Sequence, residues 1–171
     1  KTLQTSLAEE GMPEELLSEY IFESCIRKDA GSRKELYLLK RIEDSSKALL
    51  RITKNYPEED ALEEAKLLMR LDHPGVPKAL FSCEKDGKSY LVREYAEGRT
   101  LHEIVTEKGC LSAEDIYGIA GKLADILSYL HRQTPPVIHR DIKPQNIIAG
   151  TDGSIHLIDF GIAREHKQQR R

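Results

Sequence analysis

Two short polar segments on either side of a predicted β-hairpin constrain this chain more than any other feature. Residues 139–146 read His-Arg-Asp-Ile-Lys-Pro-Gln-Asn, and residues 159–161 read Asp-Phe-Gly. Between them, apolar runs at 147–149 and 155–158 flank the turn residues Thr-Asp-Gly at 151–153, a pattern typical of two short strands joined by a turn. One polar segment therefore leads into the hairpin, and the other leaves it.

The residue types in these segments match the requirements of phosphoryl transfer from a nucleoside triphosphate. Such a reaction needs a carboxylate to orient the acceptor hydroxyl and oxygen ligands to hold Mg²⁺ against the phosphates. Asp141 can supply the first, Asn146 and Asp159 can supply the second, and Lys143 adds a positive charge beside the migrating group. Asp and Asn are also common in turns and caps. The joint spacing of Asp141, Asn146 and Asp159 favours the chemical roles.

The composition is that of an ordinary globular protein. The 171 residues, 39% hydrophobic and 32% charged, can form one core or two small lobes. A formal net charge of −3 gives no reason to expect nucleic acid or an anionic membrane as a partner. Cys25, Cys83 and Cys110 lack a CxxC spacing, which argues against a disulfide framework or a zinc site and favours a cytoplasmic location. No apolar run is long enough to cross a bilayer, so a membrane tether would require a segment outside this chain.

The predicted elements indicate an α+β architecture. Residues 1–18 form a polar lead-in with a helical turn near 14–17. Strands are predicted at 20–26, 35–42 and 48–53, a helix at 58–71, and further strands at 79–83 and 89–93. A connector at 94–98 precedes a helix at 100–107 and a long helix that Ser112 caps. This order predicts a small antiparallel sheet with one helix, followed by a mainly helical part.

Apolar residues recur at helical spacing in both of the longer helices. In the first, they predict a sheet-facing side made of Ala61, Leu62, Ala65, Leu68 and Met69. In the second, they predict a stripe made of Ile116, Ile119, Ala120, Leu123, Ala124, Leu127 and Leu130. A stripe that no neighbouring element covers would invite dimerisation or aggregation.

From about residue 20 to residue 164, the sequence resembles a eukaryotic-type serine/threonine protein kinase of the sort also found in bacteria. The two polar segments carry most of this resemblance, and Lys143 is the serine/threonine-type residue at its position. The stretches 71–77 and 91–98 also resemble the family's post-helix turn and hinge. The resemblance implies a protein-kinase-like fold, with a five-stranded antiparallel N-lobe carrying one helix and an incomplete, mainly helical C-lobe.

The resemblance also implies a division of the chain and a set of site residues. Its expected parts are a lead-in at 1–18, an N-lobe at 19–93, a hinge at 94–98, a partial C-lobe at 99–163 and the start of the activation segment at 164–171. The implied reaction transfers the γ-phosphoryl group of MgATP to a protein hydroxyl, with Asp141 and Lys143 catalytic and Asn146 and Asp159 binding Mg²⁺. The implied ATP contacts are Gly31, Arg51, Glu64, Glu94, Ala96 and Ile148.

Three further residues of the two polar segments are not expected to take part in the reaction. Two of them have expected structural roles, and the third has two possible roles. In the family, residues at the positions of His139 and Phe160 pack into a column that links the lobes, so we expect structural roles for both. Arg140 resembles the arginine that pairs with a phosphorylated activation segment. An exposed arginine in a local salt bridge is an equally good interpretation.

The sequence departs from the family pattern at three places near the expected nucleotide. Arg51 occupies the position of the family's strand lysine. In the family, this lysine pairs with a helix glutamate, whose counterpart here is Glu64. Lys54 could substitute, but an odd spacing puts Arg51 and Lys54 on opposite faces of a strand. The stretch 27–34, which corresponds to the glycine-rich loop, keeps only Gly31. Arg93 occupies the gatekeeper position and would need a carboxylate if buried, for which Glu64 is a candidate.

The sequence begins at Lys1 and stops soon after Asp159-Phe160-Gly161, before the activation segment and helices that the resemblance predicts. We therefore expect a fragment of a longer kinase or a truncated remnant, with C-lobe surface left uncovered. Two other functions remain open. A pseudokinase-like interaction module, with weak or no nucleotide binding and no phosphotransfer, is favoured by the departures near the nucleotide. A small-molecule phosphotransferase of kinase-like fold is disfavoured by Lys143 and the Asp-Phe-Gly motif.

Overall fold

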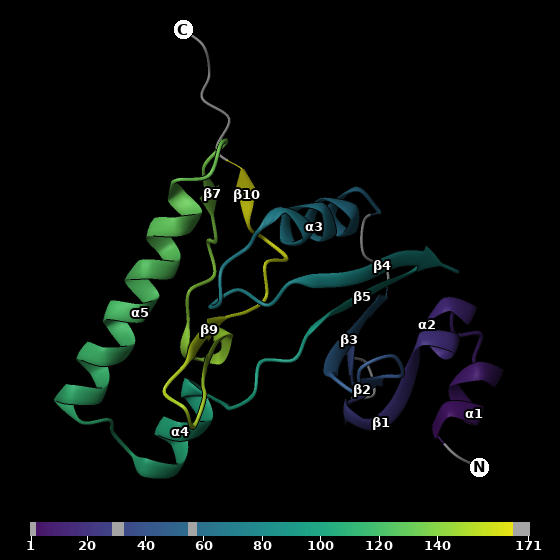
Figure 1. The fold of residues 1–171 in the computed structure, drawn as a ribbon, viewed down its shortest axis with the longest axis horizontal. Helices are drawn as coiled ribbons and strands as arrows, with labels where there is room; N and C mark the ends of the chain where they lie inside the picture. Colours follow the sequence, from purple (N-terminus) through teal and green to yellow (C-terminus); the bar gives the residue numbers. More distant parts are fainter. Residues whose placement is uncertain (1–2, 29–32, 55–57, 166–171) are drawn as a thin grey trace, which may run out of the picture. The chain divides into compact units, whose positions relative to one another are not determined.

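The computed structural model describes residues 3–28, 33–54 and 58–165, and the chain forms two compact units (Figure 1). The first unit contains Lys1–Ala65 and Lys78–Tyr95. The second contains Lys66–Pro77 and Ala96–Arg171. Among the described residues, no helix is both long enough and apolar enough to cross a membrane.

A five-stranded antiparallel sheet forms the centre of the first unit, as the sequence predicted. Its strands are β1 (Tyr20–Arg27), β2 (Lys34–Arg41), β3 (Lys47–Lys54), β4 (Ala79–Lys85) and β5 (Lys88–Glu94). They are ordered β1-β2-β3-β5-β4. In the central strand β3, Arg51 lies between Leu36 of β2 and Leu91 of β5. Because side chains alternate along a strand, Leu50 and Ile52 point to the face opposite Arg51.

Two N-terminal helices cover this opposite face of the sheet. They are α1 (Leu3–Glu9) and α2 (Glu14–Glu19), which lie beside β1 in Figure 1. Leu7, Met12 and Leu16 are almost fully buried in one apolar core with sheet residues of β1, β2, β3 and β5. The sequence predicted only one helical turn here. The expected lead-in therefore contributes directly to the core of the first unit.

Gln4 attaches helix α1 to the beginning of the sheet. Its Nε2 donates hydrogen bonds to the carbonyl oxygens of Leu17 and Tyr20, both at 3.2 Å. Its Oε1 accepts a hydrogen bond from the backbone N–H of Phe22 at 3.0 Å. One amide side chain thus satisfies three backbone groups around the junction of α2 and β1, which stabilises the N-terminal cover.

A buried carboxylate also lies on the face that α1 and α2 cover. Glu35 is 5% exposed, forms an ion pair with Lys54 and accepts a hydrogen bond from the hydroxyl of Tyr37 at 2.9 Å. Burial raises the pKa of Glu35, but the hydrogen bonds from Lys54 and Tyr37 outweigh burial and keep its pKa below the ordinary value of 4.5. Lys54 therefore forms its ion pair on the face of the sheet opposite Arg51, as the spacing predicted.

The buried side of helix α3 (Glu58–Arg70) differs from the predicted one. Ala65 and Leu68 are buried as expected, but Leu62 is 47% exposed and Met69 is 52% exposed. Their predicted contact with the sheet is therefore wrong. Glu64 is 3% exposed and lies near the centre of the buried side. A pattern based on apolar residues alone could not include a glutamate, so it placed the stripe too far toward Leu62 and Met69.

The second unit contains two main helices and two small sheets. Helix α4 (Leu101–Lys108) begins with a capping box between Thr100 and Glu103, and α5 (Ala113–His131) begins at the N-cap Ser112. Strands β6 (Arg99–Thr100), β8 (Ile147–Ala149) and β9 (Ile155–Leu157) form one sheet, in the order β6-β8-β9. Strands β7 (Val137–Ile138) and β10 (Arg164–Glu165) pair in the other. The 3-10 helix Pro144–Asn146 precedes β8, so the predicted hairpin after Asn146 is present.

The turn after α3 is packed tightly within the second unit. A Cβ atom on Gly75 would lie only 2.4 Å from Cδ1 of Ile126 in α5, so any other residue would have to displace this helix side chain. The carbonyl oxygen of Gly75 accepts a hydrogen bond from the N–H of Leu157 in β9 at 2.8 Å. The backbone N–H of Asp72 donates to the Tyr129 hydroxyl at 2.7 Å. This turn thus connects α5 to the β8–β9 hairpin.

Only part of the apolar stripe on α5 is buried. Leu130 is fully buried, together with Ile126, which the predicted stripe did not include. Ile116 is 51% exposed, and the neighbouring Tyr117 is 78% exposed. Dimerisation through this surface stays a prediction.

The packing of the N-terminal helices α1 and α2 on the sheet can be tested with two leucine-to-alanine variants in the first unit. Leu16→Ala removes a fully buried side chain from the core, so we expect a loss of about 3 kcal/mol in the free energy of unfolding. The matched variant Leu62→Ala changes a half-exposed leucine, and we expect a change within about 0.5 kcal/mol. Urea denaturation measures both values. Equal losses in the two variants would contradict the proposed role of α2 in the core.

Candidate active site

Three of the predicted site residues meet at the carboxylate of Asp141 in the second unit. Lys143 Nζ donates a hydrogen bond to Asp141 Oδ2 at 2.6 Å. Asn146 Nδ2 donates to the same oxygen and to the carbonyl oxygen of Asp141, both at 2.9 Å. The 3-10 helix that ends at Asn146 brings its side chain back over Asp141. The spacing that suggested a common site therefore corresponds to a contact between these residues.

These contacts keep the Asp141 carboxylate ionised. The hydrogen bond from Lys143 lowers the pKa of Asp141 below its ordinary value of 3.8, partial burial opposes this shift, and the hydrogen bond from Asn146 adds to it. The side chain is 28% exposed, so a hydroxyl group can approach it. The arrangement provides an oriented, accessible carboxylate that can accept a hydrogen bond, which is the geometry required of a residue that orients an acceptor hydroxyl.

The β8–β9 hairpin brings Asn146 and Asp159 to the same end of the small sheet. The backbone N–H of Ile158 donates to the carbonyl oxygen of Asn146 at 2.9 Å, directly beyond the ladder of β8 and β9. Asp159 is the next residue and has a φ of +62°. This left-handed conformation is uncommon for a residue other than glycine, and such conformations occur preferentially at functional sites.

The residue types at this end suit Mg²⁺ that is shared with phosphates. Asn146 uses its amide nitrogen to bind Asp141, so its amide oxygen is available for a cation, and Asp159 adds a carboxylate. Mg²⁺ commonly takes one or two such protein oxygens together with substrate phosphates. In the described ranges, no cluster of three or more His, Cys, Asp and Glu side chains could hold a metal ion by itself. The donor set therefore fits a metal bound together with a nucleotide.

His139 and Phe160 form a buried aromatic pair beneath these groups. Their ring centroids are 4.6 Å apart in an edge-to-face arrangement, and each side chain is 1% exposed. His139 Nδ1 accepts a hydrogen bond from the Asp141 N–H at 3.3 Å, and Nε2 lies 3.2 Å from the Ile158 carbonyl oxygen. Burial lowers the pKa of His139 below its ordinary value of 6.5, so the ring is neutral at pH 7. Both residues have the structural role that the sequence suggested.

In the first unit, Arg51 forms a buried ion pair with Glu64. Arg51 Nη2 donates to Glu64 Oε2, and the two side chains are 13% and 2% exposed. The pair joins β3 to α3 and corresponds to the lysine–glutamate pair that the resemblance implies, with arginine in place of lysine. Because Arg51 already binds Glu64, Arg93 is not needed to neutralise this carboxylate. The pairing of Arg93 with Glu64 remains a hypothesis.

The other expected ATP contacts are distributed over both units. At the end of β5, the carboxylate of Glu94 accepts a hydrogen bond from the N–H of Lys78 at 3.1 Å. Ala96 is in the connector of the second unit, and Ile148 is on β8, paired with His156. Gly31 lies outside the described residues. Arg140 is exposed and has a φ of +66°.

One connection of the second unit was not predicted from the sequence. Arg70 Nη1 at the end of α3 lies 2.7 Å from Glu165 Oε1 on β10, the short strand that follows the Asp-Phe-Gly segment. Both residues are only partly exposed. The two positions are far apart in the sequence, so no spacing pattern could indicate their pairing.

Comparison with known proteins agrees with this geometry. The pattern that defines the protein kinase domain matches residues 23–171. The chain belongs to the protein kinase domain family. It is 40% identical over 102 residues to a probable serine/threonine-protein kinase of Clostridium perfringens, and 42% identical over 103 residues to serine/threonine-protein kinase B of Synechocystis. It is also 34% identical over 106 residues to sperm motility kinase 2B of Mus musculus.

These matches cover similar shares of this chain and small shares of its relatives. The matched segments are 60%, 59% and 62% of the chain, but only 15%, 18% and 22% of the Clostridium, Synechocystis and mouse proteins, respectively. The chain therefore resembles serine/threonine-type protein kinases, as the sequence predicted.

The Arg51–Glu64 pair predicts how the kinase responds to substitution of Arg51. Arg51→Met leaves the Glu64 carboxylate buried without its cation, so we expect a loss of about 3 kcal/mol in the free energy of unfolding. Arg51→Lys keeps a positive charge and should lose less than about 1.5 kcal/mol. The double variant Arg51→Met with Glu64→Gln should recover part of the loss. Urea denaturation tests this order, and strictly additive losses in the double variant would contradict the pairing.

The neutral state of His139 predicts a dependence of stability on pH. Its pKa is lowered in the folded state, so above about pH 6.5 the ring is neutral in both states. As the pH falls through 6.5, the unfolded chain binds a proton more readily than the folded chain, and stability decreases. The melting temperature should therefore fall between pH 7.5 and pH 5.5, with a smaller slope for His139→Gln. The exposed His131→Gln should keep the original slope, and equal slopes in both variants would refute this origin.

Proposed function

We propose that this kinase domain binds MgATP and transfers its γ-phosphoryl group to a serine or threonine hydroxyl of a protein substrate. The observation that carries the proposal is the Asp141 carboxylate held by Lys143 and Asn146. A carboxylate that is ionised, oriented by two donors and partly exposed is suited to bind the acceptor hydroxyl and to accept its proton. Family membership supports the same reaction.

Lys143 has two functions in this proposal. Its ammonium group orients Asp141 and keeps the carboxylate ionised, because the hydrogen bond favours the charged form. The same positive charge would lie close to an acceptor hydroxyl bound at Asp141 and would stabilise negative charge that develops on the transferred phosphoryl group. His139 supports both residues indirectly, since its ring accepts the backbone N–H of Asp141.

Asn146 and Asp159 would hold Mg²⁺ through an amide oxygen and a carboxylate. When bound, the metal ion would neutralise the phosphate charge and orient the phosphates. Asn146 thereby connects the two parts of the site, because its nitrogen binds Asp141 while its oxygen remains for the metal. We propose that Arg51, oriented by Glu64, provides the phosphate-binding cation in place of lysine.

Three further residues would contact the base of the nucleotide, and one its phosphates. Backbone groups at Glu94 and Ala96 are proposed to bind the adenine edge, and Ile148 to supply an apolar contact. Gly31 would approach the phosphates through its backbone. A protein substrate, a cytoplasmic location and the absence of a nucleic-acid partner complete the proposal.

The proposal can be tested by separating MgATP binding from phosphoryl transfer. If the dissociation constant is on the order of 0.1 mM, 5 mM MgATP stabilises the folded state by about 2 kcal/mol, so we expect the melting temperature to rise by about 7 °C. Asp159→Asn should lose most of this rise because it removes the metal-binding carboxylate. Asp141→Asn should keep the rise but reduce transfer of radiolabelled phosphate to a serine-containing protein by at least about 1000-fold. ATP with EDTA is the control for the metal.

A pseudokinase-like interaction module is the second candidate. It is favoured by arginine at position 51 and by the single glycine in the stretch 27–34, since both alter residues that bind phosphates. It predicts no melting shift with MgATP in either the original protein or Asp159→Asn. Labelling of a small hydroxyl compound without labelling of protein would instead support a small-molecule phosphotransferase.

A further inference from the structure

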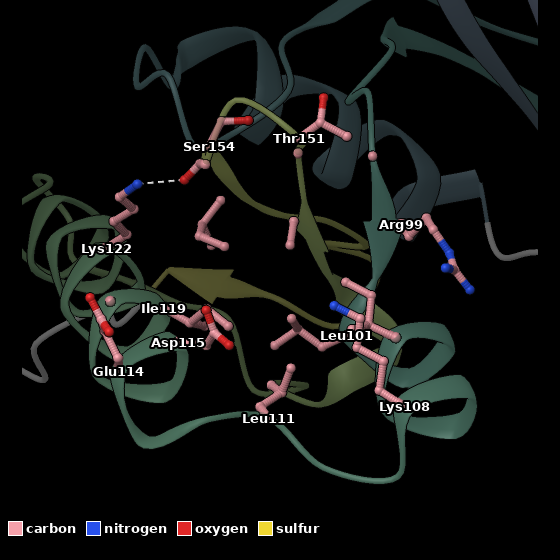
Figure 2. Close-up of a pocket in the computed structure, with 17 residues that line it drawn as sticks. Arg99, Leu101, Lys108, Leu111, Glu114, Asp115, Ile119, Lys122, Thr151 and Ser154 are labelled. Carbon is pink, nitrogen blue, oxygen red and sulfur yellow. Dashed lines mark hydrogen bonds between the residues drawn. The ribbon is translucent and has the colours of Figure 1, made fainter.

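A pocket of about 470 Å³ lies within the second unit, between α4, α5 and the turn that joins β8 to β9 (Figure 2). Its size falls in the range of small-molecule sites. Much of its wall is apolar and is provided by Leu101, Ile104, Leu111, Ile119 and Ile155. None of the residues assigned to MgATP or phosphoryl transfer lines it. The pocket is therefore separate from the residues proposed for MgATP binding and phosphoryl transfer.

Charges of opposite sign lie on opposite walls of this pocket. Lys108, at the end of α4, provides the positive charge on one side, and Glu114 and Asp115, in the first turn of α5, provide the negative charge on the other. Figure 2 shows Lys108 and Asp115 extending toward the pocket from these two sides.

The other two basic side chains at the pocket already have partners within the protein. Arg99 forms an ion pair with Glu107 and points away from the pocket in Figure 2, and Lys122 donates to the carbonyl oxygen of Gly153. Within the described part of the chain, the side chains of Lys108 and Glu114 have no hydrogen-bond or ion-pair partner. The Asp115 carboxylate accepts one hydrogen bond, from the Ser112 hydroxyl at 2.7 Å. The charges that remain for a ligand are therefore the ammonium group of Lys108 on α4 and the carboxylate of Glu114 on α5, with the partly engaged carboxylate of Asp115 beside it.

A glycine in the middle of α5 leaves space in the pocket wall. Gly118 lines the pocket, and a Cβ atom added there would meet no other atom within 4 Å. Glycine destabilises the interior of a helix relative to alanine, and no packing contact requires it at this position. Gly121, one turn further on, has equally open surroundings but does not line the pocket. Substitutions at the two glycines therefore form a matched pair of variants that can test whether a ligand binds in the pocket.

We propose that this pocket binds a small zwitterionic ligand with an apolar body, of the class of short apolar peptides with free termini. The ligand carboxylate would lie toward Lys108, the ammonium group toward Glu114 and Asp115, and the apolar side chains against Leu101 and Ile119. Opposite charges on two walls favour a zwitterion over a simple fatty acid or amine, because either of those would leave one wall uncompensated. This inference does not rest on the proposed phosphotransfer.

The test uses trileucine as the probe and the 171-residue chain, with binding measured by calorimetry. We expect a dissociation constant on the order of 0.1 mM. Lys108→Gln and Glu114→Gln should each weaken binding by about two- to fivefold, as expected for partly exposed ion pairs, and the effect should diminish at 1 M NaCl. N-acetyl-trileucine should respond to Lys108→Gln but not to Glu114→Gln, and trileucine amide should show the reverse pattern.

Two helix variants test the location of the ligand. Gly118→Leu should fill the pocket and abolish trileucine binding at 1 mM, whereas Gly121→Leu should bind like the original protein. Both substitutions favour the helix, so both variants should melt at or above the original temperature. Equal binding by the two variants would overturn the location. Equal affinity for trileucine and for its doubly capped form, or no binding at 10 mM, would overturn the ligand class.

Discussion

The buried ion pair between Arg51 and Glu64 is the constraint on which the arrangement of the first unit depends. A carboxylate that is almost fully removed from water is stable only with a close cation, and Arg51 is presented by the central strand of the sheet. The pair therefore determines which side of α3 faces inward and leaves Leu62 and Met69 exposed. It also gives the two faces of β3 different roles, since Leu50 and Ile52 are in the core that the N-terminal helices cover.

A corresponding role in the second unit belongs to the hairpin of β8 and β9. Its ladder places Asn146 opposite Ile158, and Asp159 follows at once. Asn146 then reaches back to Asp141, while the buried rings of His139 and Phe160 support the loop from below. The candidate site thus depends on local backbone pairing and one aromatic contact, both of which place polar groups close together without requiring a large core.

Much of this could be predicted from the sequence because the signals were local. The strands, α4, α5 and the hairpin follow from apolar periodicity, turn residues and caps over short stretches. The grouping of Asp141, Lys143 and Asn146 follows from their spacing within one loop. By contrast, helix α1 was missed because its sequence is polar on most sides, and only packing on the sheet buries Leu7. The predicted orientation of α3 was wrong because the buried side of this helix includes a charged residue, Glu64.

The sequence by itself therefore determined the family, the order of the elements and the residue types available for phosphoryl transfer, since each is encoded within a few consecutive residues. The resemblance already implied the pairing of Arg51 with Glu64, which the structure contains. Only the tertiary structure decided the pairs of Glu35 with Lys54 and of Arg70 with Glu165, which join separate elements. The same holds for the pocket between α4, α5 and the β8–β9 turn. The physical reason is that desolvation and cavity shape depend on neighbours that are distant in sequence, whereas helix and strand periodicity depends on adjacent residues.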